Sequence, residues 1–173
     1  MATLYQPAGA DLTAVDSTAK FTVGQKGCAT DGSEWIYVEI ASGVTAITQY
    51  MTCLVERATY TAAGSLGGAA NDGNTKMPAF HQGSTTLTAG DFCWLMTQGA
   101  PRIMVAKAAA ENAQLFTTQT TGVLDDAIAT GSQYPLRGVV AASISAGVAS
   151  NTAGGVGDGR ATNPNIGPIV ALY

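Results

Sequence analysis

The one histidine of the chain, His81, is the residue whose type most readily suggests catalysis. A catalytic histidine needs a nucleophile and an orienting group beside it. The sequence contains neither a GxSxG nucleophile elbow nor an HExxH zinc motif. A metal ion would find His81 alone, because the cysteines are spread too widely to join it in a zinc site. We therefore predict a structural role for His81, and an enzyme that uses it ranks only third among the functional hypotheses.

Two neighbouring carboxylates, Asp125 and Asp126, could in principle perform acid–base chemistry. Adjacent residues on a strand point to opposite faces, which would separate the two groups. Polarity at a turn or a sheet edge is the interpretation we favour.

The glycine-rich stretch at residues 154–160 suggests a phosphate-binding loop. It lacks the GK[ST] ending, and Pro164 and Pro168 oppose the helix that should follow. A calcium-binding GGxGxD repeat would place its aspartate one residue later and would occur in tandem. The stretch is predicted to be a flexible loop, and we expect no catalytic, cofactor or metal site and no enzymatic activity.

The aromatic residues Trp35, Tyr37, Phe92 and Trp94 occur in apolar surroundings. Such rings can stack on sugars or bases, but packing in a core is their more common role. Core packing is therefore the favoured interpretation.

Aromatic and β-branched runs predict a mainly β fold, a compact barrel or sandwich of short strands. The strands are expected at residues 35–40, 49–55, 92–97, 102–106, 114–121, 136–142 and 166–172. Alternation along the first would turn Ile36, Val38 and Ile40 toward the core. The turn at residues 98–101 predicts a hairpin between its two flanking strands.

The remaining segments are predicted from their glycine and alanine content. Residues 59–87 and 146–167 read as long glycine-rich loops within a single β domain at residues 21–173. Residues 1–20 read as an extended N-terminal arm. Residues 106–115 could form a helix, but a turn between two strands is slightly preferred.

Charge and cysteine content narrow the class of partner. Only 12% of the 173 residues are charged, the net charge is −4 and the pI is near 4.7. Nucleic acid and anionic membranes both require a basic surface, so neither is expected as a partner. No apolar run is long enough to span a bilayer. Three scattered cysteines, Cys28, Cys53 and Cys93, predict buried free thiols. So low a charge is typical of a protein whose surface is covered by partners.

Three stretches of the chain form a recognisable series. They are a polar lead, an Asp-Gly turn and an aromatic strand at residues 21–38; a glycine-plus-aromatic strand and turn at 89–101; and a threonine-rich entry at 115–124 with a strand at 136–140. Together they resemble the small decoration, or cement, proteins of tailed bacteriophages. The resemblance implies a virion protein, assembled in the host cytoplasm, that binds the major capsid protein on the outer capsid surface. It also implies a homotrimer and stabilisation of the shell. The rival hypothesis is a carbohydrate-binding or adhesive β module of a tail fibre or cell surface, which would need Trp35 and Trp94 exposed in a row.

Overall fold

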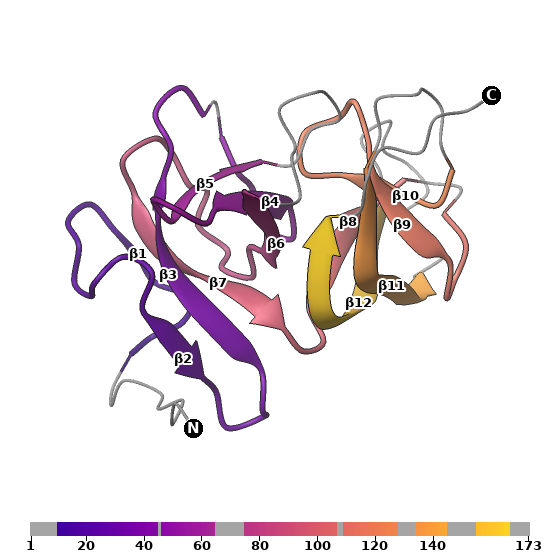
Figure 1. The fold of residues 1–173 in the computed structure, drawn as a ribbon, viewed down its shortest axis with the longest axis horizontal. Helices are drawn as coiled ribbons and strands as arrows, with labels where there is room; N and C mark the ends of the chain where they lie inside the picture. Colours follow the sequence, from indigo (N-terminus) through magenta and orange to yellow (C-terminus); the bar gives the residue numbers. More distant parts are fainter. Residues whose placement is uncertain are drawn as a thin grey trace.

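The computed structural model describes residues 10–44, 46–64, 75–106, 109–127, 134–144 and 155–166. All regular elements within these ranges are β-strands, so the predicted mainly β fold is confirmed. The strands form two units, a curled sheet and a closed barrel, which lie next to each other (Figure 1). The described residues include no helix long and apolar enough to cross a membrane.

The curled sheet has seven strands in the order β1-β7-β6-β4-β5-β3-β2. Strand β3 pairs with β5 and β2 along one edge and with β7 along the other, which rolls the sheet back on itself. Its strands are β1 (Val15–Asp16), β2 (Lys26–Cys28), β3 (Glu34–Ile40), β4 (Thr52–Glu56), β5 (Thr61–Gly64), β6 (Lys76–Phe80) and β7 (Phe92–Gln98).

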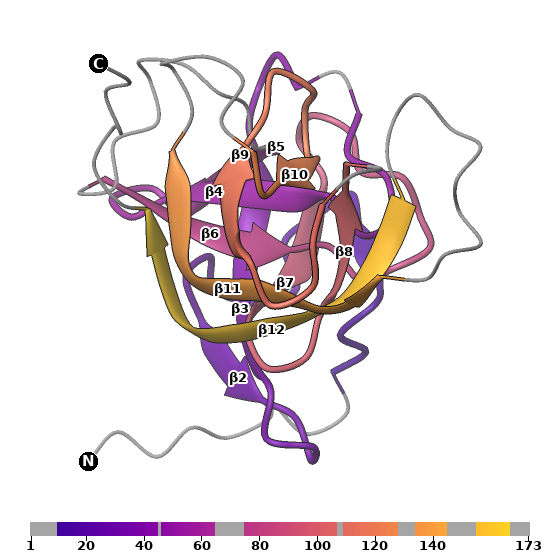
Figure 2. The same cartoon turned by 90° about the vertical axis from the view of Figure 1, so that its right-hand side faces the viewer.

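The closed barrel has five strands in the order β10-β8-β12-β11-β9, and β9 pairs with β10 to close the ring. The strands are β8 (Arg102–Val105), β9 (Gln114–Thr117), β10 (Leu124–Asp125), β11 (Pro135–Ile144) and β12 (Gly155–Ile166). The long antiparallel pair β11–β12 curves around one side of the barrel (Figure 2). Strand β12 also lies against β6 and β7, which joins the barrel to the curled sheet.

The prediction of a hairpin at residues 98–101 is wrong, because the two strands that flank this turn do not pair with each other. Strand β7 pairs with β1, β3 and β6, whereas β8 pairs with β10 and β12, so the segment carries the chain from one unit to the other. Gly99, with φ +132°, exchanges two backbone hydrogen bonds with Ala161 of β12, at 3.0 and 2.9 Å. The Gly-Ala-Pro sequence of residues 99–101 signals a change of direction but does not specify the partner of the strand that follows.

The two faces of β3 bury different sets of side chains. Ile36, Val38 and Ile40 belong to a cluster inside the curled sheet, and their predicted alternation is confirmed. Cys53 and Cys93 lie in the same interior. All three cysteines are free, as expected, although Cys28 is only half-buried. Burial raises the pKa of Cys53 to about 12 and that of Cys93 still further, which keeps both thiols protonated and unreactive.

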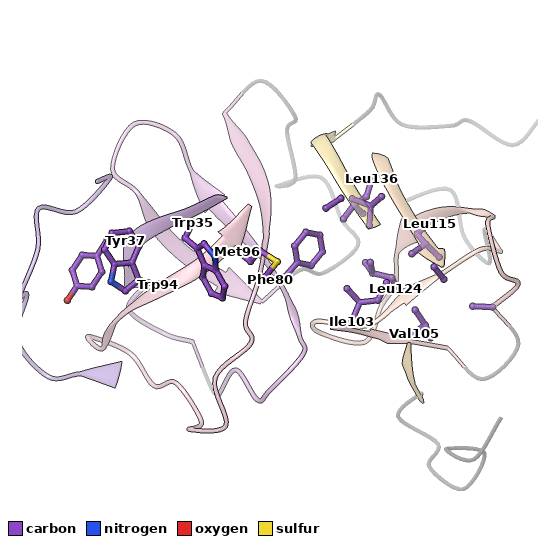
Figure 3. Close-up of a cluster of buried hydrophobic side chains, with 14 residues drawn as sticks. Trp35, Tyr37, Phe80, Trp94, Met96, Ile103, Val105, Leu115, Leu124 and Leu136 are labelled. Carbon is purple, nitrogen blue, oxygen red and sulfur yellow. The ribbon is translucent and has the colours of Figure 1, made fainter. Parts of the chain in front are cut away.

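The outer face of β3 and β7 continues into the interior of the closed barrel as a second cluster, which we call the shared cluster. On the sheet it begins with Tyr37, Trp94, Trp35 and Met96, and Phe80 of β6 connects them to the barrel (Figure 3). The barrel contributes small and aliphatic side chains, namely Ile103, Val105, Ala109, Leu115, Leu124, Leu136, Val139, Ala141 and Ala161. The two units therefore share one hydrophobic core.

Residues 10–20, predicted as part of an arm, lie on the body in this structure. Strand β1 pairs with β7, and Leu12 and Phe21 pack against the shared cluster. The Phe21 ring meets Tyr37 and Trp94 edge-on, with centroids 5.2 and 5.3 Å apart. The backbone N–H of residue 20 donates to the Tyr37 hydroxyl at 3.2 Å. Residues 1–9 lie outside the described residues.

The two predicted long loops are wrong in part, because they contain strands. Strands β5 and β6 lie within residues 59–87, and β12 lies within residues 146–167. Strands β5 and β12 contain several Gly and Ala residues and β6 contains a proline, and the weak intrinsic β signal of these residues hid the strands. Small residues are needed there: Ala62 is fully buried where β5 closes the sheet, and a Cβ at Gly159 would lie 3.0 Å from the Pro101 carbonyl.

Three other expectations concern element boundaries. The slight preference for a turn over a helix at residues 106–115 is confirmed at residues 109–113, and β9 begins at residue 114. The strand expected at 49–55 begins only at residue 52, because Tyr50 adopts φ +69°. Of the strand expected at residues 166–172, all but residue 166 lies outside the described residues.

We predict that Phe80→Ala destabilises the whole chain. Phe80 is fully buried at the junction of the two units, and removing a buried phenylalanine ring costs about 3–5 kcal/mol. Urea denaturation followed by tryptophan fluorescence and by far-UV circular dichroism should give one shared transition at lower urea. Phe116→Ala, at a half-buried ring on β9, is the control and should cost less. Two separate transitions would contradict a shared core.

Candidate functional site

A charged pocket lies at one end of the curled sheet, where β3 begins and β4 and β7 end. It encloses about 140 Å³. We call it the mouth pocket, and it is lined by Lys26, Glu34, Ile36, Arg57, Met77, Pro78, Thr97 and Gln98. The mouths of barrels are common places for ligand sites, because the strands there present converging side chains without filling the space.

Strand alternation explains why polar groups converge there. Side chains two residues apart on a regular strand share a face, so β3 extends its interior row by one position at the mouth. On β7 the register shifts here, since Trp35 pairs with Met96 and Glu34 with Gln98, and both Thr97 and Gln98 line the pocket. Glu34 precedes the buried Ile36 on β3, and Thr97 follows the buried Leu95 on β7. Each interior row therefore changes from apolar to polar at this end. The Thr97 hydroxyl is already engaged, since it donates to the Glu34 carbonyl at 3.1 Å.

The two cations reach the mouth from different elements. Lys26 lies on β2 in register with Ile36, and Arg57 begins the turn after β4. This turn is well anchored, because the Arg57 N–H donates to Thr75 at 2.7 Å and the Tyr60 N–H donates to Glu56 at 2.8 Å. The backbone position from which the Arg57 side chain extends toward the mouth is thus fixed.

The same turn closes over the start of β2. Tyr60 adopts φ +55° and its ring lies on Gly24, where a Cβ would be 2.4 Å from the ring carbons. Gly24 itself has φ +87°, so both its conformation and its contact require glycine. The same two elements, β2 and the β4–β5 turn, contribute Lys26 and Arg57 to the mouth pocket.

The charges of the mouth pocket do not neutralise one another by direct contact. Within the described part of the chain, Lys26, Glu34 and Arg57 form no ion pair or side-chain hydrogen bond. Two cations and one carboxylate leave the pocket with one net positive charge. Arginine and lysine bind carboxylates and phosphates through several N–H donors, so an anion is the ligand that this arrangement favours.

His81 is not part of this pocket. Its side chain is only 1% exposed, and Nε2 lies 2.8 Å from the Thr85 carbonyl. A carbonyl can only accept, so Nε2 carries the proton and Nδ1 is an unprotonated acceptor. Among the described residues, Nδ1 has no hydrogen-bond partner. Burial lowers the pKa of His81, and the Thr85 carbonyl offsets part of that effect. His81 is thus a buried neutral side chain, and its contacts fit the structural role predicted for it.

The Asp125 and Asp126 carboxyl groups are not separated, although alternation along a strand would have placed them on opposite faces. Strand β10 ends at Asp125, so the alternation stops there and the two carboxyl groups interact. Burial and the Asp126 carboxyl group raise the pKa of Asp125. Asp126 accepts from the Ala110 N–H at 2.9 Å, which fits a structural role in the turn.

The other sequence candidates are also used by the fold. Residues 155–160 of the glycine-rich stretch belong to β12 instead of a loop, and residue 154 lies outside the described residues. Trp35 and Trp94 are 6% and 2% exposed, so the interpretation as core residues is confirmed. The exposed tryptophan row required by the carbohydrate-binding hypothesis is not formed. Within the described residues, no group of three or more His, Cys, Asp or Glu could hold a metal ion.

The residues of the mouth pocket carry a sequence signal that is not a motif of adjacent residues. Each of its charges looks like an ordinary solvated side chain when considered alone. The signal is a charge two residues beyond an inward-facing apolar residue, as in Glu34 before Ile36 and Arg57 after Val55.

Comparison with known proteins found no protein-family model, no curated protein and no solved structure that matches the chain.

We predict that His81 makes the fold sensitive to mild acid. Its folded pKa lies below the unfolded value of about 6.5, so the unfolded state binds the proton more readily. Stability should therefore fall as the pH drops below about 6.5 toward the folded pKa, and no further below it. Thermal melts between pH 7.5 and 5 should show a smaller loss for His81→Gln than for the wild type. Equal losses would contradict this assignment.

We predict that Asp125→Asn stabilises the protein at pH 7. A raised folded pKa means that the charged carboxylate is less favourable in the folded state, and asparagine removes that charge. The gain should fade as the pH falls through the folded pKa to the unfolded value of about 3.9. Asp11→Asn is the control with the opposite sign, because hydrogen bonds from Thr13 lower the pKa of Asp11. Melting temperatures of both variants at pH 7 and pH 3 test the pair; a loss of stability in Asp125→Asn at pH 7 would contradict the prediction.

Proposed function

We propose that the protein is a virion structural protein, a capsid decoration protein of a tailed bacteriophage that binds the outer surface of the shell as a homotrimer. The observation that carries the proposal is the chemistry of its surface. Of the 36 described residues that are exposed, 15 are Ser or Thr and only 8 are charged. Hydroxyl groups lose less on desolvation than charges do, so such a surface suits permanent contacts.

The shared cluster supports the same proposal. It joins the curled sheet and the closed barrel into one body, and a clamp that resists the expansion of a shell must itself resist deformation. Close-packed copies with few charges also repel one another little. Weak contacts repeated over a symmetric shell add up to firm attachment.

The oligomeric state and shell binding test the proposal together. The full chain should sediment as a trimer of 17.5 kDa subunits. Added to capsids assembled from the major capsid protein of the same phage, it should bind and raise their melting temperature. Capsids of an unrelated phage are the control. A monomer that neither binds the capsids nor stabilises them would contradict the proposal.

A further inference from the structure

Among the described strands, the outer edge of β2, beside the mouth pocket, has no partner. Strand β2 is the last strand in the order of the curled sheet, and β3 is its one partner within the described residues. Gln25 accepts from Tyr37 at 2.9 Å and Ala29 donates to Ser33 at 2.8 Å, both toward β3. Backbone groups alternate sides along a strand, so Lys26 and Cys28 direct theirs to the outer edge. Neither residue has a backbone hydrogen bond there within the described part of the chain.

Lys26 connects this open edge to the charged pocket. Its backbone groups lie on the outer edge of β2, while its side chain lines the mouth pocket together with Arg57 and Glu34. An extended peptide that added to the edge would place alternate side chains over the pocket. The pocket, of about 140 Å³, is well below the roughly 300–1,000 Å³ of typical small-molecule sites.

We propose that the mouth pocket and the β2 edge bind an extended segment of a partner polypeptide that carries an acidic side chain. The Asp or Glu carboxylate enters the pocket and takes hydrogen bonds from Lys26 and Arg57, and the backbone of the segment pairs with residues 26–28. The inference rests on the proposed function only for the partner's identity as a capsid polypeptide.

The charge of the pocket favours a carboxylate over a phosphate. One net positive charge balances a monoanion, whereas the Glu34 carboxylate would repel a dianion. The apolar floor of Ile36, Met77 and Pro78 suits the methylene groups that carry the carboxylate. These features together specify an acidic side chain on an extended backbone.

Peptide titration of the full ¹⁵N-labelled chain tests the proposal. The probes are acetyl-Thr-Val-Glu-Val-Thr-amide and the same peptide with Gln in place of Glu. The Glu peptide should cause saturable amide shifts at residues 26–28, 34, 57 and 97, and should slow hydrogen exchange at Lys26 and Cys28. The Gln peptide should bind at least about 10-fold more weakly, the loss expected when one charged hydrogen-bonded group is removed.

Two variants separate the pocket from general charge effects. Arg57→Gln should weaken the Glu peptide about 10-fold and leave the Gln peptide unchanged. Arg137→Gln, at an exposed arginine of β11, is the matched control and should change neither affinity. Both variants should keep the wild-type melting temperature within a few degrees, because both arginines are exposed.

Specific outcomes would overturn the proposal. They are the absence of shifts at the mouth, equal affinity for the two peptides, and tighter binding of inorganic phosphate or glucuronate than of the Glu peptide. These outcomes are distinct from failure of the proposed function. Capsid binding unchanged by Arg57→Gln would contradict the inference alone, whereas Glu-peptide binding by a chain that ignores capsids would contradict the capsid proposal alone.

Discussion

The outer face of β3 and β7 imposes the main constraint on this structure, because it carries aromatic side chains that must be removed from water. Tyr37 and Trp94 are covered by Phe21 from the N-terminal segment. Trp35 and Met96 lead to Phe80 and the closed barrel (Figure 3). Burial of large rings is the strongest favourable contribution available to a chain with so few charges. The N-terminal segment, the curled sheet and the closed barrel are therefore held together by one cluster.

This arrangement also determines where binding chemistry can lie. Both faces of β3 are buried over most of its length, so its polar positions are confined to the strand ends and to neighbouring turns. At one end, the interior rows terminate in Glu34 and Thr97. Lys26 and Arg57 approach the same place from β2 and from the β4–β5 turn. The mouth pocket is thus a consequence of how the curled sheet ends, and each of its three charges comes from a different element.

Strand positions were predictable where side chains carry a strong signal, and pairing partners were not. The run at residues 35–40 revealed both its strand and its faces, because its aromatic and β-branched residues alternate. Strand β12 was missed, since its glycine-containing sequence forms a strand only by pairing with the backbone of β8 and β11. The hairpin failed because turn residues specify local geometry while pairing is decided by tertiary packing. Lys26 and Arg57 were overlooked as site residues, because only the folded sheet brings positions 31 residues apart together.

In the proposed function, the chain acts by binding the surface of a capsid and not by catalysis. Electron microscopy of the particle with which the chain co-purifies tests this most directly. Reconstruction of that particle should show the two-unit body on the outer surface of a phage shell, with the β2 edge and the mouth pocket against a capsid polypeptide. An acidic side chain of that polypeptide should lie between Lys26 and Arg57. A shell without this density would contradict the account, and so would a body bound with the mouth pocket facing solvent.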